Sequence, residues 1–214
     1  MGPGFALLGD YRPIAAFTER VVLGLRSASY SLGSASHLYV RLQTPAEFNS
    51  EKKFGPGFDN WVWYADNLVQ ENFETLDAAL RFQIVAQAVR VSLLELTPDW
   101  AFQINDVCDA AINVGSTIRF PVKSKKYRNA RIEVSVNVAD HPALAVMKVE
   151  VIDPTSETVL QAFEVSLSNH QHAYMLASNI KIAERRLILV PRNSFSAQLE
   201  LRKYTLPLTF ELLS

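Results

Sequence analysis

The sequence predicts an α+β protein with a helix-containing first part and a strand-rich second part. A long segment near the middle of the chain has helical periodicity. After residue 117 the apolar residues alternate with polar ones, and turn residues recur about every ten residues. We therefore expect a long central helix and a helical N-terminal part packed on an antiparallel meander or sandwich. No Pro/Gly/Ser-rich linker separates residues 1–116 from 117–214, which favours one compact domain.

Three shorter elements are expected in the first part. A helix is predicted from Pro13 onward, because proline suits a first helical turn and one face would carry the apolar residues Ile14, Phe17, Val21, Leu25 and Ala28. The apolar run 21–25 would also suit a strand. A strand is predicted over residues 37–44, where apolar and polar side chains alternate before Pro45. A short helix is predicted over residues 105–114, because Gly115 is a suitable left-handed cap.

The clearest element is a helix predicted over residues 72–96, which Pro98 ends. At 100° per residue, its apolar side chains fall on two separate stripes. The first stripe comprises Phe73, Leu76, Leu80, Ile84, Val91 and Leu94, and the second comprises Ala78, Phe82, Val85, Val89, Leu93 and Leu96. A helix that is apolar on two faces must be covered twice, either inside the fold or by its own domain and a partner.

The second part predicts a series of antiparallel strands. The expected strands cover residues 131–138, 146–152, 159–167, 180–190, 197–204 and 206–212. The turns 140–142 and 153–155 separate the first three of them. Residues 169–186 are ambiguous and also fit a short helix.

The net charge is close to zero, but the charges are unevenly distributed. The whole chain has 21 Lys+Arg and 22 Asp+Glu, and 49% of its residues are hydrophobic, which excludes a disordered protein and a uniformly basic coat. Residues 1–116 have 8 basic and 13 acidic side chains, a net charge of −5, whereas residues 117–214 have 13 and 9, a net charge of +4. Such opposite charges indicate head-to-tail association or an acidic or phosphate-bearing partner.

The expected location is the cytoplasm. No stretch of about 18 apolar residues is present that would span a membrane. The one cysteine, Cys108, excludes a disulfide framework and a Cys-based zinc site, and an unpaired thiol fits a reducing compartment.

A run of cations is the strongest polar feature. Six of them lie within thirteen residues: Arg119, Lys123, Lys125, Lys126, Arg128 and Arg131. With Phe120 and Tyr127 among them, these cations would bind the phosphates of single-stranded nucleic acid while the rings stack on bases. The alternative is a solvated hairpin end, in which lysines protect an exposed strand edge.

An aromatic segment follows the Gly55-Pro56-Gly57 turn. Five of the 22 aromatic residues lie within eleven positions: Phe54, Phe58, Trp61, Trp63 and Tyr64. These side chains form either a lid over the core or an interface for a protein partner or a second copy, since tryptophan and tyrosine dominate contact hot spots.

Two candidate catalytic or metal sites are weaker. His170 and His172 would share a face in a strand and could bind one metal ion, but a solvated polar turn is the favoured interpretation of the pair. Cys108 near Asp106 or Asp109 could be a nucleophile, although its apolar neighbours favour a buried structural cysteine. No phosphate loop, dinucleotide fingerprint or hydrolase motif is present. We expect no catalytic residue, no bound metal and no cofactor.

Three short stretches resemble the coat proteins of rod-shaped plant viruses, the tobamovirus-like group. The stretches are Thr44-Pro45-Ala46-Glu47-Phe48, then Phe58-Asp59-Asn60-Trp61 with Asn72-Phe73, then Thr117-Ile118-Arg119-Phe120-Pro121 with Lys126-Tyr127-Arg128. The resemblance covers about a third of the chain. It implies a self-assembling subunit that binds single-stranded RNA, with Arg119 and Arg128 as candidate contacts. It also implies a helical bundle, whereas residues 130–167 and 197–213 are patterned as strands.

These observations favour a non-enzymatic protein that self-assembles or binds a partner. The two apolar helix faces, the aromatic segment and the opposed charges are all suited to homo-oligomer contacts, and the basic run would add nucleic acid. A one-to-one binding module, such as an inhibitor or immunity-type protein, is the alternative. A metal-dependent enzyme using His170 and His172 is a third hypothesis.

Overall fold

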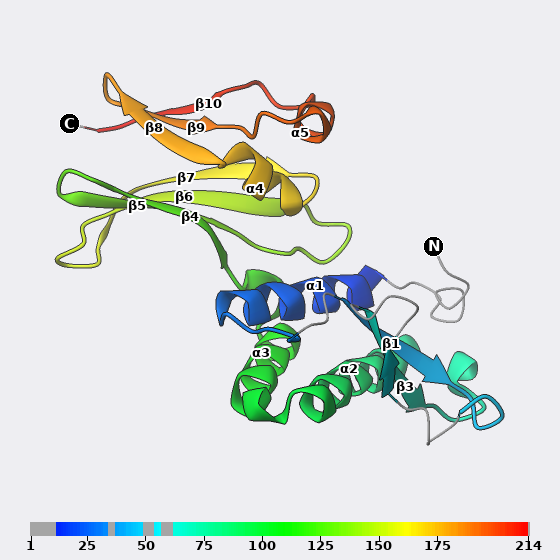
Figure 1. Ribbon diagram of the computed structural model, residues 1–214. Helices are drawn as coiled ribbons and strands as arrows, with labels where there is room; N and C mark the ends of the chain where they lie inside the picture. The colour runs from blue at the N-terminus through cyan, green and yellow to red at the C-terminus, as the bar shows by residue number, and fades with distance from the viewer. Residues whose placement is uncertain (1–11, 34–36, 49–53, 57–61, 214) are drawn as a thin grey trace. The chain divides into compact units, whose positions relative to one another are not determined.

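The computed structural model describes residues 12–33, 37–48, 54–56 and 62–213 (Figure 1). The chain divides into two compact units, Met1–Gly115 and Ser116–Ser214, which we call unit 1 and unit 2. This division falls one residue before the change in periodicity and charge. The α+β class is confirmed. That the two parts form one domain stays a prediction.

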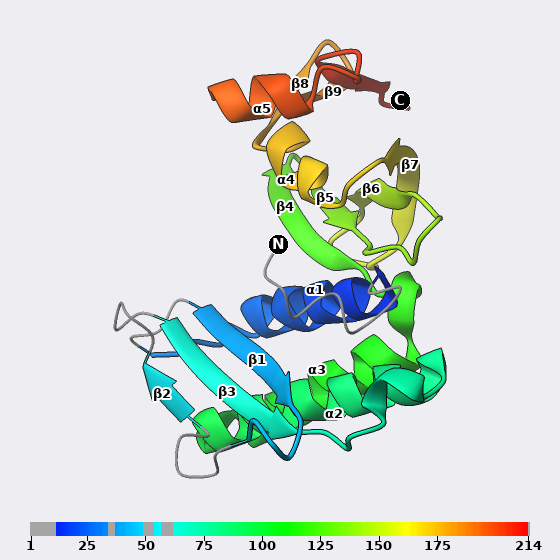
Figure 2. The same cartoon turned by 90° about the vertical axis from the view of Figure 1, so that its right-hand side faces the viewer.

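Unit 1 contains three helices and a small sheet. Its elements are α1 (Arg12–Ser27), β1 (His37–Gln43), β2 (Phe54–Pro56), β3 (Val62–Leu68), α2 (Ala78–Leu96) and α3 (Ala101–Asn113). The three helices share one buried cluster, to which α1 contributes Phe17, α2 contributes Val89 and α3 contributes Ile104. Leu38 and Val40 of β1 pack against the same cluster, so the sheet lies beside the helices (Figure 2).

The sheet of unit 1 has the order β1-β3-β2, with β1 and β3 parallel and β2 antiparallel to β3. Arg41 and Asp66 are in register across the parallel pair. The Arg41 guanidinium binds both carboxylate oxygens of Asp66, with Nε–Oδ1 at 2.5 Å and Nη2–Oδ2 at 2.8 Å. Asp66 is buried while Arg41 is half exposed, so the arginine supplies the charge that the buried carboxylate requires.

The predicted central helix is present, but its predicted start was wrong. α2 begins at Ala78 because the Asp77 side chain caps it, accepting a hydrogen bond of 2.8 Å from the Leu80 amide. The preceding Phe73–Thr75 forms a separate 3₁₀ turn. Val85, Val89 and Leu93, from the second predicted stripe, are buried.

The other expected elements of unit 1 are confirmed with small changes of boundary. α1 buries Phe17, Val21 and Leu25 as predicted, and β1 ends at Gln43. α3 begins at Ala101, earlier than expected, because the 3₁₀ turn Pro98–Trp100 leads directly into it.

Unit 2 is formed by two antiparallel sheets and two short helices (Figure 1). The first sheet is a meander of β4 (Phe120–Tyr127), β5 (Ala130–Val136), β6 (Ala145–Ile152) and β7 (Val159–Leu167). The second has the order β10-β9-β8 and comprises β8 (Asn179–Ala183), β9 (Arg186–Val190) and β10 (Leu208–Glu211). The helices are α4 (Gln171–Leu176) and α5 (Phe195–Glu200).

The two sheets enclose one core. Ile132 and Met147 of the first sheet, Leu176 of α4 and Leu187 of β9 all belong to the same buried cluster. Side chains also bridge the sheet edges. Lys125 Nζ of β4 donates to the Ile180 carbonyl of β8 at 2.6 Å, and Gln161 Nε2 of β7 donates to the Glu211 carbonyl of β10 at 2.8 Å.

Two predictions for unit 2 need correction. Residues 180–190 form a hairpin of two strands instead of one strand. Residues 197–204, predicted as a strand, contain most of α5, which Ser194 caps by accepting from the Ala197 amide at 3.3 Å. Ala197 and Leu201 are the buried residues there, and a spacing of four fits both helical and strand periodicity. The short helix that residues 169–186 allowed is α4.

Candidate functional site

An apolar groove of about 550 Å³ runs along α2 in unit 1. Seven apolar residues line it: Phe48, Leu68, Val69, Leu80, Ile84, Ala88 and Val91; the other lining residues are the uncharged amides Asn67, Gln83 and Gln87. We call it the α2 groove. Three of these residues, Leu80, Ile84 and Val91, belong to the first predicted stripe. α2 therefore directs its second stripe into the core and part of its first stripe into the groove, as expected of a helix that must be covered twice.

The α2 groove is open to solvent and lies next to acidic residues. Leu68 is 55% exposed and Leu80 is 39% exposed. None of the described residues that line it is charged. The loop between Val69 and Leu80, however, has three exposed carboxylates, those of Glu71, Glu74 and Asp77. The segment that connects two lining residues of the groove, Val69 and Leu80, is therefore negatively charged.

The predicted basic run forms one hairpin of unit 2. β4 is an edge strand of the meander and pairs with β5 through the two-residue turn Arg128–Asn129. Arg128 has a left-handed backbone, with φ of 50°. The register shifts between Pro121 and Lys123, where the alternation along β4 is interrupted.

Three of the six predicted cations make contacts within unit 2. Arg131 binds Glu133 at 2.7 Å and Glu157 at 2.6 Å, and its hydrogen bond lowers the pKa of the Glu157 carboxyl below its ordinary value. Arg119 Nη1 donates to the Val146 carbonyl at 2.8 Å, and Lys125 donates to the Ile180 carbonyl. These contacts support the structural interpretation of the run for Arg119, Lys125 and Arg131.

The other three cations are exposed. Lys123, Lys126 and Arg128 form no ion pair with any residue that the structure describes. The Arg128 guanidinium lies over the Tyr127 ring, 5.2 Å from its centroid. A smaller cationic surface, with one aromatic ring, therefore remains available at the end of the hairpin.

The predicted aromatic interface falls mostly outside the described part of the chain. The side chains of Phe54, Phe58 and Trp61 lie outside the described residues. Tyr64 stacks on Tyr39 of the neighbouring strand, with ring centroids 5.5 Å apart, and the Arg41 guanidinium lies 4.6 Å from the Tyr64 centroid. Trp63 is half buried. The role of this segment as an interface stays a prediction.

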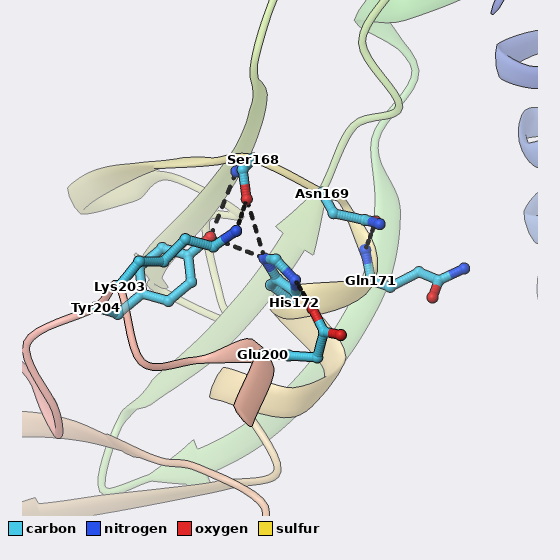
Figure 3. A network of polar contacts seen from close by, with 7 residues as sticks. All are labelled: Ser168, Asn169, Gln171, His172, Glu200, Lys203 and Tyr204. Carbon is cyan, nitrogen blue, oxygen red and sulfur yellow. Dashed lines mark hydrogen bonds and ion pairs between the residues drawn. The ribbon is translucent and has the colours of Figure 1, made fainter. Parts of the chain in front are cut away.

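His172 is the centre of a polar network in unit 2 (Figure 3). Its Nδ1 lies 2.9 Å from the Tyr204 hydroxyl and 3.4 Å from Ser168 Oγ, and its Nε2 lies 3.4 Å from a carboxylate oxygen of Glu200. Lys203 Nζ donates to Ser168 Oγ. Burial lowers the pKa of His172, an effect that Glu200 partly opposes. The network connects the start of α4 with the end of α5.

The strand geometry assumed for the two histidines was wrong. His170 and His172 lie at the start of helix α4, where side chains two residues apart point in different directions. Within the described residues, no group of three His, Cys, Asp or Glu side chains could hold a metal ion. Ser168, Lys203 and His172 resemble a nucleophile with two bases, but none of them lines the α2 groove. None of them lines the second groove either, which lies along β4 and β5 and includes Lys123 and Glu133.

Cys108 is buried in the helical core of unit 1. Burial raises the pKa of its thiol, although the nearby Arg90 opposes this effect. A raised pKa keeps the thiol protonated, which disfavours a nucleophile and supports the structural interpretation.

No family model, curated protein or solved structure matches this chain. The resemblance to coat proteins of rod-shaped plant viruses therefore stays a prediction. Among the described residues, no helix is both long enough and apolar enough to cross a bilayer.

The sequence revealed the helix face of the groove but not the opposite wall. The residues missed on that wall include Phe48, Asn67, Leu68 and Val69, of which the last two end β3 and follow it. The sequence signal of Leu68 and Val69 was an apolar pair immediately before the polar stretch 70–72. Such a pair is common at strand ends, so only the fold shows that it faces α2.

Proposed function

We propose that this protein is a non-enzymatic structural protein that self-assembles, and that the α2 groove is one of its contact surfaces. The observation that carries the proposal is the exposure of Leu68 and Leu80 in a groove without charged lining residues. Contiguous exposed apolar surface is rare on monomeric proteins and marks sites of association. Covering it would stabilise an assembly by about 25 cal/mol for each Å² removed from water.

Light scattering across a concentration series at low salt tests this proposal. We expect the molar mass to rise with concentration, and Leu68→Glu to shift the rise to at least roughly tenfold higher concentration, because it places a charge in an apolar contact. Leu144→Glu is the matched control, since Leu144 is 56% exposed against 55% for Leu68 and lies outside the groove. A wild-type protein that remains monomeric throughout would overturn the proposal.

Nucleic acid is a second candidate ligand, and the hairpin β4–β5 is its proposed site. The supporting observation is the group of three exposed cations, Lys123, Lys126 and Arg128, beside the Tyr127 ring. Single-stranded nucleic acid fits this chemistry, because phosphates pair with the cations and bases stack on the ring. A high ratio of absorbance at 260 nm to that at 280 nm in the purified protein would support this candidate.

The one-to-one binding module remains the alternative to self-assembly. A protein that is monomeric at all concentrations but recovers a single stoichiometric protein partner would favour that module. We also propose a cytoplasmic location, which suits the buried, unpaired thiol of Cys108.

A further inference from the structure

Helix α5 in unit 2 exposes an apolar face to solvent. Phe195 is 77% exposed and Leu199 is 40% exposed. The two residues are four positions apart in the helix, so their side chains lie on the same face. Ala197 and Leu201 anchor the opposite side of this segment in the core. We call Phe195 and Leu199 the α5 face.

Positive charge flanks the α5 face. Arg192 precedes it and Arg202 follows it, and both side chains are exposed. Neither forms an ion pair with a residue in the described part of the chain. The nearby Glu200 carboxylate is directed toward His172, as Figure 3 shows. The α5 face is thus an exposed apolar pair with an exposed arginine three residues before it and another three residues after it in the chain.

The α2 groove has the complementary properties. Most of its lining residues are apolar, like the two side chains of the α5 face. Its volume of about 550 Å³ is large enough for a phenyl ring and an isobutyl group. It has the exposed carboxylates of Glu71 and Glu74 nearby, where the α5 face has arginines. The two parts of the chain also have opposite net charges, which are −5 for residues 1–116 and +4 for residues 117–214.

We propose that the α5 face of one copy occupies the α2 groove of a second copy, with Arg192 and Arg202 near Glu71 and Glu74. This inference rests on the proposed self-assembly and names the contact that produces it. The two surfaces are different, so the contact is heterologous. Repeating it from copy to copy gives a closed ring or an open helical array.

Two variants that each lack one surface test the contact. Leu68→Glu/Leu80→Glu blocks the groove but retains the α5 face, and Phe195→Glu/Leu199→Glu does the reverse. All four side chains are exposed, so circular dichroism should show that both variants fold. Each variant alone should be monomeric in analytical ultracentrifugation. An equimolar mixture should form a 1:1 dimer and nothing larger, because only one complementary pair of surfaces remains.

The outcomes separate this inference from the proposed function. A monomeric wild type overturns both. If wild type assembles but Phe195→Glu/Leu199→Glu assembles equally well, the groove has another occupant and only this inference is overturned. If both variants are monomeric but their mixture forms no dimer, the α5 face and the α2 groove do not bind one another, and this inference is again overturned.

A charge exchange provides an independent test. Two charge-reversal variants are suited to this test: Arg192→Glu/Arg202→Glu and Glu71→Lys/Glu74→Lys. Each should weaken assembly several-fold, because like charges would then face each other. Each should also reduce the salt dependence of assembly, because charges at the rim of an interface act mainly on the association rate. In a mixture, the unchanged α5 face of the Glu71→Lys/Glu74→Lys variant can bind the unchanged groove of the Arg192→Glu/Arg202→Glu variant. This contact should have the wild-type affinity. No recovery would contradict the proposed pairing of charges.

Discussion

The structural role of several side chains in this protein depends on partners that are distant in the sequence. Arg131 is paired with Glu157, 26 residues away, and Lys125 binds a carbonyl 55 residues away. The sequence identifies both as members of a basic run but contains no local signal of these contacts. The contacts of these residues could not be predicted from the sequence, because long-range partners are set by the fold.

His172 gives a prediction for the effect of pH. Burial lowers the pKa of His172 in the folded protein. As pH falls through about 6.5, the histidine of the unfolded chain takes up a proton while the folded one does not. Stability should therefore fall as pH falls from about 7.5 to about 5.5. Urea midpoints should decrease over this range in wild type and decrease less in His172→Gln.

The control for this pH effect is His37→Gln, which alters an exposed histidine of unit 1. It should show the same decrease in urea midpoint as wild type. If His172→Gln and wild type lose equal stability on acidification, His172 does not contribute as its burial predicts.

At the scale of elements, the sequence predicts regular strands well and short helices poorly. Apolar and polar residues alternate along the whole of β5, over residues 147–151 of β6 and over residues 163–167 of β7, which favours strands there. α5 was missed because Ala197, Leu199 and Leu201 also alternate like a strand. The parallel pairing of β1 with β3 has no local signal at all, because it joins segments separated by β2.

The hairpin β4–β5 gives a prediction at this scale. Lys123→Gln/Lys126→Gln/Arg128→Gly should weaken binding to a single-stranded RNA oligonucleotide in fluorescence anisotropy. The slope of log affinity against log salt should decrease by about 2, since each phosphate contact contributes roughly 0.7 for single strands. Glycine suits the left-handed backbone at Arg128, so this change should not disrupt the turn.

Arg26→Gln/Lys181→Gln is the comparison for the hairpin variant, because both cations are exposed and lie outside the hairpin. It should keep nearly wild-type affinity and slope. Equal losses in both variants would indicate that RNA binds through overall charge and not through the hairpin.

At the scale of the whole molecule, the division at Gly115 predicts independent folding of unit 2. Its buried cluster is drawn from residues 132–201. The first residue of unit 2, Ser116, is also bound to this unit, because Asn137 Nδ2 donates to its carbonyl at 2.8 Å. The fragment Ser116–Ser214, of about 100 residues, has the size of a typical domain. It should unfold cooperatively on heating, as followed by circular dichroism.

If the fragment shows no cooperative transition while the full chain unfolds cooperatively, unit 2 does not fold independently. That result would support the single compact domain expected from the absence of a linker. The charge and periodicity boundary was visible in the sequence. Whether such a boundary separates stable cores was not, because core membership depends on which strands pair.

The side chains that bridge the sheets of unit 2 limit how copies of this chain can join. Lys125 binds the Ile180 carbonyl of β8 and Gln161 binds the Glu211 carbonyl of β10, so one main-chain carbonyl of each of these two strands is already hydrogen-bonded to a side chain. An incoming strand from another chain, which would pair with almost any sequence, has fewer free groups to bind. Association is then left to exposed side chains, and partner choice can change by single substitutions without rebuilding the fold.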